Sequence, residues 1–215
     1  MKTIINIIIG VFMNLMYISC KQNSTPPYEN QRITQTKIDS CDDPDANVHC
    51  CFVNMHQIPI DIMVIADNNV EGDRLVITGT IYKSDGKTPF PNILIYAYQT
   101  DSTGHYSKTG NEKGIQKWHG QLHGWCKTGT DGQYKIISIR PGAYPDNKFP
   151  AHIHAAIKTT NGKAFYITDF VFKGDSLVND NYISSLPKMQ GGTGIIQLKK
   201  ENNTWIGQRN IVLSE

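Results

Sequence analysis

The chain has 215 residues, of which 39% are hydrophobic and 19% charged, and its formal net charge is +2 at pH 7. This composition is typical of a folded domain rather than a disordered chain, and the length favours a single hydrophobic core. A net charge this small excludes the strong field with which basic proteins attract nucleic acid. We therefore expect no nucleic-acid partner.

The N-terminus has the pattern of a secretory signal peptide, which we assign to residues 1–19. Lys2 supplies the positive charge, and an apolar run from Ile4 to Met16 is too short to span a bilayer comfortably. The four residues that end at Cys20 resemble a loose bacterial lipobox, which implies that Cys20 becomes the lipidated first residue. Cleavage nearby without lipid, or a buried apolar segment, would explain the same pattern.

Residues 20–40 are rich in Asn, Gln, Ser, Thr and Pro and contain few apolar side chains. Such a segment cannot bury enough surface to fold, so we expect a flexible tether. With a lipid on Cys20, the tether would hold the protein at a membrane. The membrane is then an expected partner, and the bacterial cell envelope is the expected location after export.

Four cysteines follow Cys20, an even number that favours one or two disulfides in an exported protein. Three full pairings are open, although two adjacent cysteines are too close to bridge each other easily. A zinc site is less favoured because the paired C-x2-C spacing is absent. Residues 41–73 form a cysteine-containing segment ahead of the main domain, which we place at 74–215. The four cysteines are Cys41, Cys50, Cys51 and Cys126.

From Arg74 onward, apolar and polar residues alternate with the period of two that is typical of strands. Glycine-containing turns such as Asp131-Gly132 separate short runs of this kind, and no long apolar helical stripe competes. The sequence therefore predicts an all-β sandwich or barrel. Further strands are expected at 92–100, 133–139, 152–159, 163–172, 193–199 and 204–213, with long irregular segments at 105–124 and 140–151.

His152 and His154 lie at the start of one of these strands and would point to the same face, with Ile153 directed into the core. Two histidines on a polar strand face often bind no metal, so the pair alone is weak evidence. A two-histidine, one-carboxylate iron site is disfavoured, because residues 155–168 contain no Asp or Glu.

Tyr106 follows a turn, and Tyr144 lies in a loop rich in proline and glycine. A phenol has a pKa of roughly 10, but a trivalent cation lowers it and makes the phenolate oxygen a hard ligand suited to Fe(III). Each tyrosine taken alone would equally fit a surface aromatic that packs on the sandwich.

Five segments of the chain, about half of its length, are similar in order and spacing to the intradiol ring-cleavage dioxygenases. The resemblance implies a β-sandwich of the intradiol dioxygenase core type, in which Fe(III) is bound by Tyr106, Tyr144, His152 and His154. The segments are GTIYKSDGKTPFPNILIYAYQTDSTGHY (79–106), HGWCKTGTDGQYKI (123–136), RPGAYP (140–145), PAHIH (150–154) and TDFVFKGD (168–175).

The resemblance also implies a reaction. A small aromatic diol of the catechol type and O2 would be the partners, and the ring would open between its two hydroxyl-bearing carbons to give a muconate-type diacid. Tyr144 would be displaced by the substrate, which gives it a catalytic role as well. Trp118 and His119 are the expected substrate contacts in the loop after Tyr106.

The chain departs from the family pattern at two positions. Phe149 stands where catalytic members commonly have an arginine, which places Phe149 at the substrate and leaves Lys148 as the candidate catalytic cation. An ammonium does not replace a planar guanidinium. Asp169 stands where a glutamine is often found.

A different class of protein remains as the alternative. GTIYKSDGKTPFPN and TGTDGQYKI also resemble transthyretin-like and carboxypeptidase-regulatory-like modules, which bind or brace without catalysis. Such a module of the cell envelope would explain the fold but not the four ligand-type residues. The sequence gives no indication of the oligomeric state.

Overall fold

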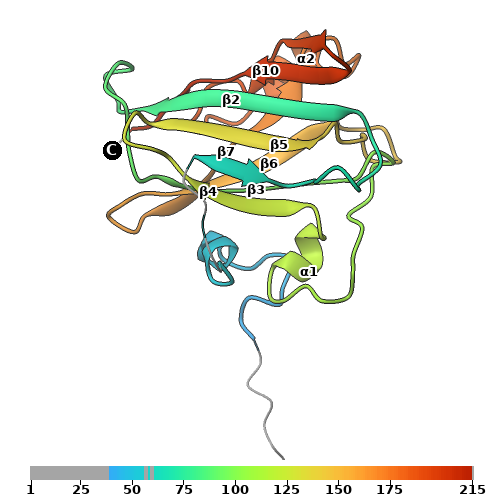
Figure 1. Cartoon of the computed structure of the whole chain (residues 1–215), viewed down its shortest axis with the longest axis horizontal. Coiled ribbons are helices and arrows are strands. Elements are labelled where there is room, and N and C mark those ends of the chain that lie inside the picture. Colours follow the sequence, from blue (N-terminus) through green and yellow to red (C-terminus); the bar gives the residue numbers. More distant parts are fainter. Residues whose placement is uncertain (1–38, 56–57, 59–60, 215) are drawn as a thin grey trace, which may run out of the picture. The chain divides into compact units, whose positions relative to one another are not determined.

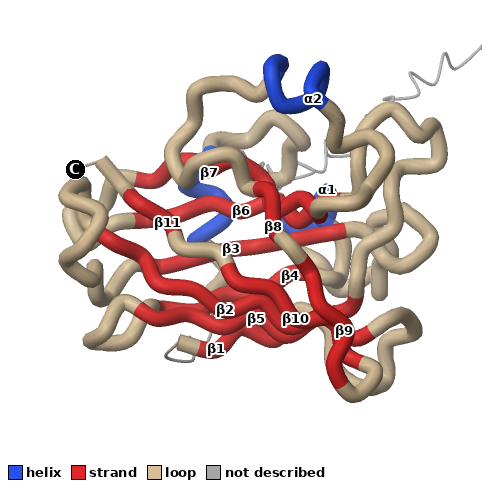
Figure 2. The backbone as a smooth tube through the Cα atoms, turned by 90° about the horizontal axis from the view of Figure 1, so that it is seen from above, coloured by secondary structure: helices blue, strands red, loops and turns tan. Residues whose placement is uncertain are grey.

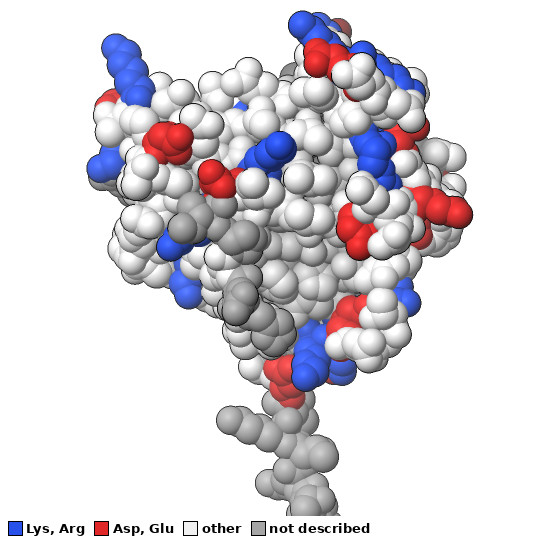
Figure 3. Space-filling view, viewed as in Figure 1, with Lys and Arg blue, Asp and Glu red and all other residues white. Residues whose placement is uncertain are grey.

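The computed structural model describes residues 39–55, 58 and 61–214. The expected signal peptide, Cys20 and nearly all of the expected tether lie outside these residues. Among the described helices, none is long and apolar enough to cross a membrane. Basic and acidic side chains are interspersed over the face seen in Figure 3, as the small net charge predicts.

The described residues form two β-sheets that pack face to face (Figures 1 and 2). The first sheet has the order β1-β5-β2-β10-β9, with β11 beside β2: β1 (Ile62–Val64), β2 (Arg74–Tyr82), β5 (Gln133–Ile139), β9 (Leu198–Glu201), β10 (Thr204–Gln208) and β11 (Ile211–Val212). The second has the order β4-β3-β6-β7-β8: β3 (Leu94–Gln99), β4 (His123–Lys127), β6 (His152–Lys158), β7 (Ala164–Phe172) and β8 (Ile195–Ile196). The predicted β-sandwich is confirmed.

The core lies between the two sheets and follows from the alternation in the strands. Along β2, every second residue is buried, and Leu75 and Ile77 are fully inaccessible. Ile95 of β3 and Ile153 of β6 enter the same core from the second sheet. Burying each such side chain stabilises the fold by about 1.5–3 kcal/mol, so the alternation fixes which face of each strand points inward.

The outer face of the second sheet is covered as well. The 3-10 helix η1 (Val48–Phe52) and α1 (Gln116–His119) lie on the side of β3 and β4 that faces away from β2 and β5 (Figure 1). Cys51 and Phe52 of η1 pack on Tyr96 and Ala156 there. The remaining helix, α2 (Asp180–Ser185), follows β7. Because β1 pairs with β5, the sandwich includes residues ahead of position 74.

The strand expected from Arg74 onward and those expected at 92–100, 133–139, 152–159 and 163–172 are present, with small shifts at the ends of the latter. β4 was not expected, because its inward residues Gly124 and Cys126 are small and weaken the apolar pattern. The strand expected at 193–199 is divided: β8 pairs with β7 in the second sheet, whereas β9 pairs with β10 in the first. The strand expected at 204–213 is interrupted before β11.

Cys41 and Cys50 form a disulfide, whereas Cys51 and Cys126 are buried thiols. The disulfide packs with Ile115 beside α1, so it ties the residues before η1 to the outer face of the second sheet. Burial raises the pKa of Cys51 to about 11 and that of Cys126 to about 12, so both thiols stay protonated at neutral pH.

Alkylation of the unfolded protein without reductant should therefore modify Cys51 and Cys126 but neither Cys41 nor Cys50. Replacing both bridged cysteines with serine should lower the free energy of unfolding by roughly 2–3 kcal/mol, because the unfolded chain gains the entropy of an open loop. Mass spectrometry and denaturant titration measure the two effects. Modification of all four cysteines would contradict the pairing.

Candidate metal centre

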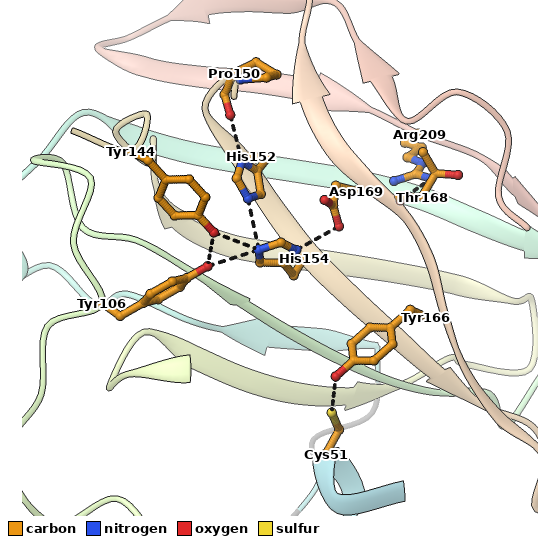
Figure 4. Close-up of polar contacts among 10 residues, drawn as sticks. All are labelled: Cys51, Tyr106, Tyr144, Pro150, His152, His154, Tyr166, Thr168, Asp169 and Arg209. Carbon is orange, nitrogen blue, oxygen red and sulfur yellow. Dashed lines mark hydrogen bonds and ion pairs between the residues drawn. The ribbon is translucent and has the colours of Figure 1, made fainter. Parts of the chain in front are cut away.

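His152 and His154 open β6 and point outward from the second sheet, while Ile153 between them is fully buried in the core. This is the arrangement that the alternation predicted. The two Nε2 atoms lie 2.9 Å apart (Figure 4).

The other ring nitrogen of each histidine is held by a group that only accepts hydrogen bonds. Nδ1 of His152 lies 2.7 Å from the carbonyl oxygen of Pro150, and Nδ1 of His154 lies 3.0 Å from a carboxylate oxygen of Asp169. Both Nδ1 atoms must therefore carry the hydrogen, which leaves a lone pair on each Nε2. Two lone pairs that face each other at 2.9 Å repel, and a cation between them removes the repulsion.

The hydroxyls of Tyr106 and Tyr144 converge on the same point. They lie 2.6 Å from each other, and 3.0 and 3.3 Å from Nε2 of His154 (Figure 4). The single lone pair on Nε2 of His154 cannot accept a hydrogen bond from both hydroxyls at once, and Nε2 of His152 has no hydrogen to donate to it. Ligands bound at about 2.0–2.2 Å to one small cation are themselves about 3 Å apart, so these four donor atoms fit a single metal ion.

Two loops hold the tyrosines through direct backbone contact. Gly142 N–H, just before Tyr144, donates to the carbonyl oxygen of Asp101 at 2.8 Å. Gly104, two residues before Tyr106, has a φ of +86°. A Cβ added at this position would lie 1.9 Å from the carbonyl oxygen of Ala143, the residue before Tyr144. Only glycine permits this approach, so the two long segments expected at 105–124 and 140–151 meet where the donors converge.

Burial favours the neutral forms of Tyr106, Tyr144 and His152 in the absence of a cation. Burial raises the pKa of Tyr106, and the hydrogen bond with Tyr144 raises it further. Burial also raises the pKa of Tyr144 and lowers that of His152. The protein therefore provides little stabilisation for charged phenolates, and a bound cation must supply it.

Tyr98 of β3 forms a wall of the cluster that the sequence reasoning missed. Its ring stacks on His154 at 4.6 Å on one side and on His119 at 3.5 Å on the other. The hydroxyl of Tyr96 lies 2.9 Å from Nδ1 of His119, and burial lowers the pKa of His119 to about 3. Tyr98 pairs with His154 across β3 and β6, which places the two rings on the same face of the sheet.

The remaining expected site residues lie at different distances from the donors. Phe149 is 55% exposed, and its ring meets the ring of Tyr144 edge-on with centroids 6.5 Å apart. His119 is separated from His154 by Tyr98. Trp118 is exposed, and Lys148 is exposed and pairs with Asp146 at 3.5 Å. The structure thus brings Phe149 to the edge of the cluster but shows no contact of Trp118 or Lys148 with the donors.

Asp169 is a further group at the site, although the sequence reasoning assigned it no role there. His152, His154 and Asp169 offer three ligand-type atoms within 4.8 Å of one another. The carboxylate lies at Nδ1 of His154, however, whereas both hydroxyls and His152 lie at Nε2, on the other side of the ring (Figure 4). Asp169 therefore supports His154 and does not share the ion that the four donors fit.

Comparison with known proteins identifies the family of the chain. The family model of the dioxygenases matches residues 50–204. The protocatechuate 3,4-dioxygenase beta chain of Burkholderia cepacia is 30% identical over 113 residues, which cover 50% of this chain and 48% of that protein. The chain spans about half the length of the curated relatives it matches.

Solved structures show the same fold. The dioxygenase domain of a dioxygenase and carbohydrate-binding protein fusion from Streptomyces sp. SirexAA-E has a TM-score of 0.56 at 19% identity, over 74% of this chain and 90% of that one. An intradiol ring-cleavage dioxygenase from Tetranychus urticae has a TM-score of 0.52 at 20% identity, over 74% and 89%. With a family match over most of its length, the chain belongs to the intradiol ring-cleavage dioxygenases.

Proposed function

We propose that the protein is a non-haem Fe(III) dioxygenase that opens the ring of a catechol-type substrate between its two hydroxyl-bearing carbons and yields a muconate-type diacid. Tyr106, Tyr144, His152 and His154 would hold the iron. The observation that carries the proposal is the convergence of two imidazole lone pairs and two phenol oxygens on one point.

The chemistry of the four donors suits ferric iron. Enzymes of this family use iron, and two phenolates would supply two negative charges and hard oxygen ligands to a trivalent ion. Neutral imidazoles complete the set. Zinc sites in proteins are built instead from cysteine, histidine and carboxylate ligands.

Bound iron would supply the Lewis-acid and redox chemistry by which a catechol reacts with dioxygen. The side chains have separate tasks. Tyr144 lies in a loop at the exposed edge, beside Phe149, and we assign it the role of yielding its place to the substrate and accepting one of the substrate's hydroxyl protons. His152 and His154 are fixed by the strand and by their Nδ1 partners, so they keep the remaining geometry constant.

The edge of the site carries an aromatic ring at the position where the family resemblance implies an arginine. Phe149 offers an apolar surface to an aromatic substrate but nothing that offsets the negative charge of a bound catecholate or of a carboxylate substituent. The ammonium of Lys148 is directed to Asp146 at the surface. We therefore propose that the substrate is a catechol without an acidic substituent and that it turns over slowly.

The purified protein should contain about one iron per chain and show a visible band from tyrosinate-to-Fe(III) charge transfer. Tyr106→Phe and Tyr144→Phe should each remove or shift this band, because each removes a phenolate ligand. Tyr82→Phe, on the first sheet, is the matched control and should leave the band unchanged. Elemental analysis and visible spectroscopy decide the matter, and a colourless protein loaded with zinc would refute the site.

Phe149→Arg should raise the rate of oxygen uptake, most strongly with protocatechuate, whose carboxylate the new guanidinium can pair. A missing charge partner in a partly desolvated site costs about 2–4 kcal/mol of transition-state stabilisation, or about 30- to 1000-fold in rate. Lys148→Ala should change the rate little, since its ammonium pairs with Asp146, and a tenfold loss would return the catalytic role to Lys148.

The assay compares catechol, protocatechuate and hydroxyquinol, with products analysed for muconate-type diacids. A robust native rate that Phe149→Arg lowers would show that the substrate lies elsewhere. If iron is bound but no variant consumes oxygen, the enzymatic proposal fails, and a binding role in the cell envelope takes its place.

The location of the protein is a separate proposal that rests on the N-terminal sequence. We propose export and a lipid anchor on Cys20, because a short apolar run with a positive start precedes a cysteine and a polar tether. The native protein should fractionate with membranes, and Cys20→Ala should release it. Mass spectrometry that finds Cys20 unmodified, or a mature terminus elsewhere, would end this proposal.

A further inference from the structure

We propose that Asp169 is a positioning residue of the metal centre, whose carboxylate orients His154 and makes it the stronger of the two imidazole donors to iron. The inference rests on the proposed function in one respect, namely that the ion is iron.

The two histidines differ in the group that holds Nδ1. The acceptor for His152 is the neutral carbonyl of Pro150, whereas the acceptor for His154 is the charged carboxylate of Asp169. A charged acceptor draws the Nδ1 hydrogen more strongly and increases the electron density on Nε2. His154 should therefore donate more charge to the ion than His152 does.

A β-bulge directs the side chain of Asp169 toward Nδ1 of His154. Ala155 pairs with Ile167 and Ile153 pairs with Phe170, so two residues of β7, Thr168 and Asp169, stand opposite His154. If β7 had no bulge here, the alternation of its side chains would continue unbroken, and Ile167 and Phe170 would point to opposite faces of the sheet. The extra residue keeps Ile167 and Phe170 in the core while Asp169 faces the imidazole.

The bulge is supported from the side that faces away from the metal centre. The backbone N–H of Thr168 donates to the carbonyl oxygen of Gln190 at 3.1 Å, and the buried guanidinium of Arg209 donates to the carbonyl oxygen of Thr168 at 2.9 Å. Arg209 also lies over the ring of Phe170 at 4.2 Å. An added Cβ on Gly194 would lie 1.8 Å from the carbonyl oxygen of Asp169. The fold therefore binds both the N–H and the carbonyl of Thr168 and packs against the backbone of Asp169, so the position of the bulge is fixed.

A negative charge behind one ligand also affects the oxidation state. It stabilises the trivalent ion more than the divalent one, so the carboxylate should favour Fe(III) and lower the reduction potential of the centre. An amide at the same position would keep a hydrogen-bond acceptor but remove the charge. The two contributions of Asp169, orientation and charge, can thus be separated by substitution.

The test measures iron affinity, reduction potential and the charge-transfer band of the full-length protein and three variants. Asp169→Asn retains the acceptor without the charge, and Asp169→Ala removes both. Asp146→Asn is the matched control, because it removes an exposed negative charge near Tyr144 that pairs with Lys148 and contacts no histidine.

Asp169→Asn should reduce the preference for Fe(III) over Fe(II) about tenfold, which corresponds to a rise of about 59 mV in potential. Its band should move to longer wavelength, because a weaker imidazole donor leaves the iron a stronger Lewis acid. Asp169→Ala should weaken Fe(III) binding by about 10- to 100-fold. Asp146→Asn should change these quantities much less than Asp169→Asn does, because Asp146 is exposed to solvent and holds no ligand of the ion.

The failures of the two proposals are distinguishable. A native protein without iron would refute the proposed function. A native protein with iron whose potential and band are the same in Asp169→Asn, Asp169→Ala and Asp146→Asn would refute the role of Asp169 and leave the proposed function intact. Because Asp169→Asn preserves shape and acceptor, it keeps the test valid if Asp169→Ala does not fold.

Discussion

The site depends on the opposition of two imidazole lone pairs, those of His152 and His154 at 2.9 Å. Each Nδ1 is committed to an acceptor, so neither ring can relieve the repulsion by exchanging its hydrogen. The opposition is imposed by the sandwich, because Ile153 is fixed in the core and β6 must then present both histidines outward. Stability of the core and affinity for a cation are thereby linked through one strand.

The rest of the centre combines a rigid half and a looser half. The sheet supplies the histidines and the wall formed by Tyr98, while loops supply Tyr106 and Tyr144. Loops position donors accurately only where their backbones are fixed. Here the close contact between Gly104 and Ala143 fixes the backbones of the two loops against each other. Tyr144, on the more exposed side and beside Phe149, is the donor that we propose yields its place to the substrate.

The sequence predicted most of the sheet and the direction of the histidines, because both follow from a period of two. It could not derive Tyr106 or Tyr144 from any period, since loop positions have none, and only the family resemblance named them. β4 was not predicted because its inward residues, Gly124 and Cys126, are small and give only a weak alternation of apolar and polar residues. The contact of Asp169 with His154 was not predicted, because a bulge shifts the register by one residue and nothing in the local sequence indicates a bulge of this kind.

The residues at positions 149 and 169 affect the charge of the centre in the same direction. Phe149 at its edge carries no positive charge, and Asp169 places a negative charge at Nδ1 of His154. A more negative surrounding stabilises ferric iron but opposes the approach of a second anion, and a chelating catechol is an anion once its hydroxyls lose their protons. Because Asp169 is partly exposed, solvent screens this repulsion without abolishing it. We propose that the centre holds iron firmly while it binds and converts its substrate slowly, and that Phe149 and Asp169 both contribute to this balance of charge.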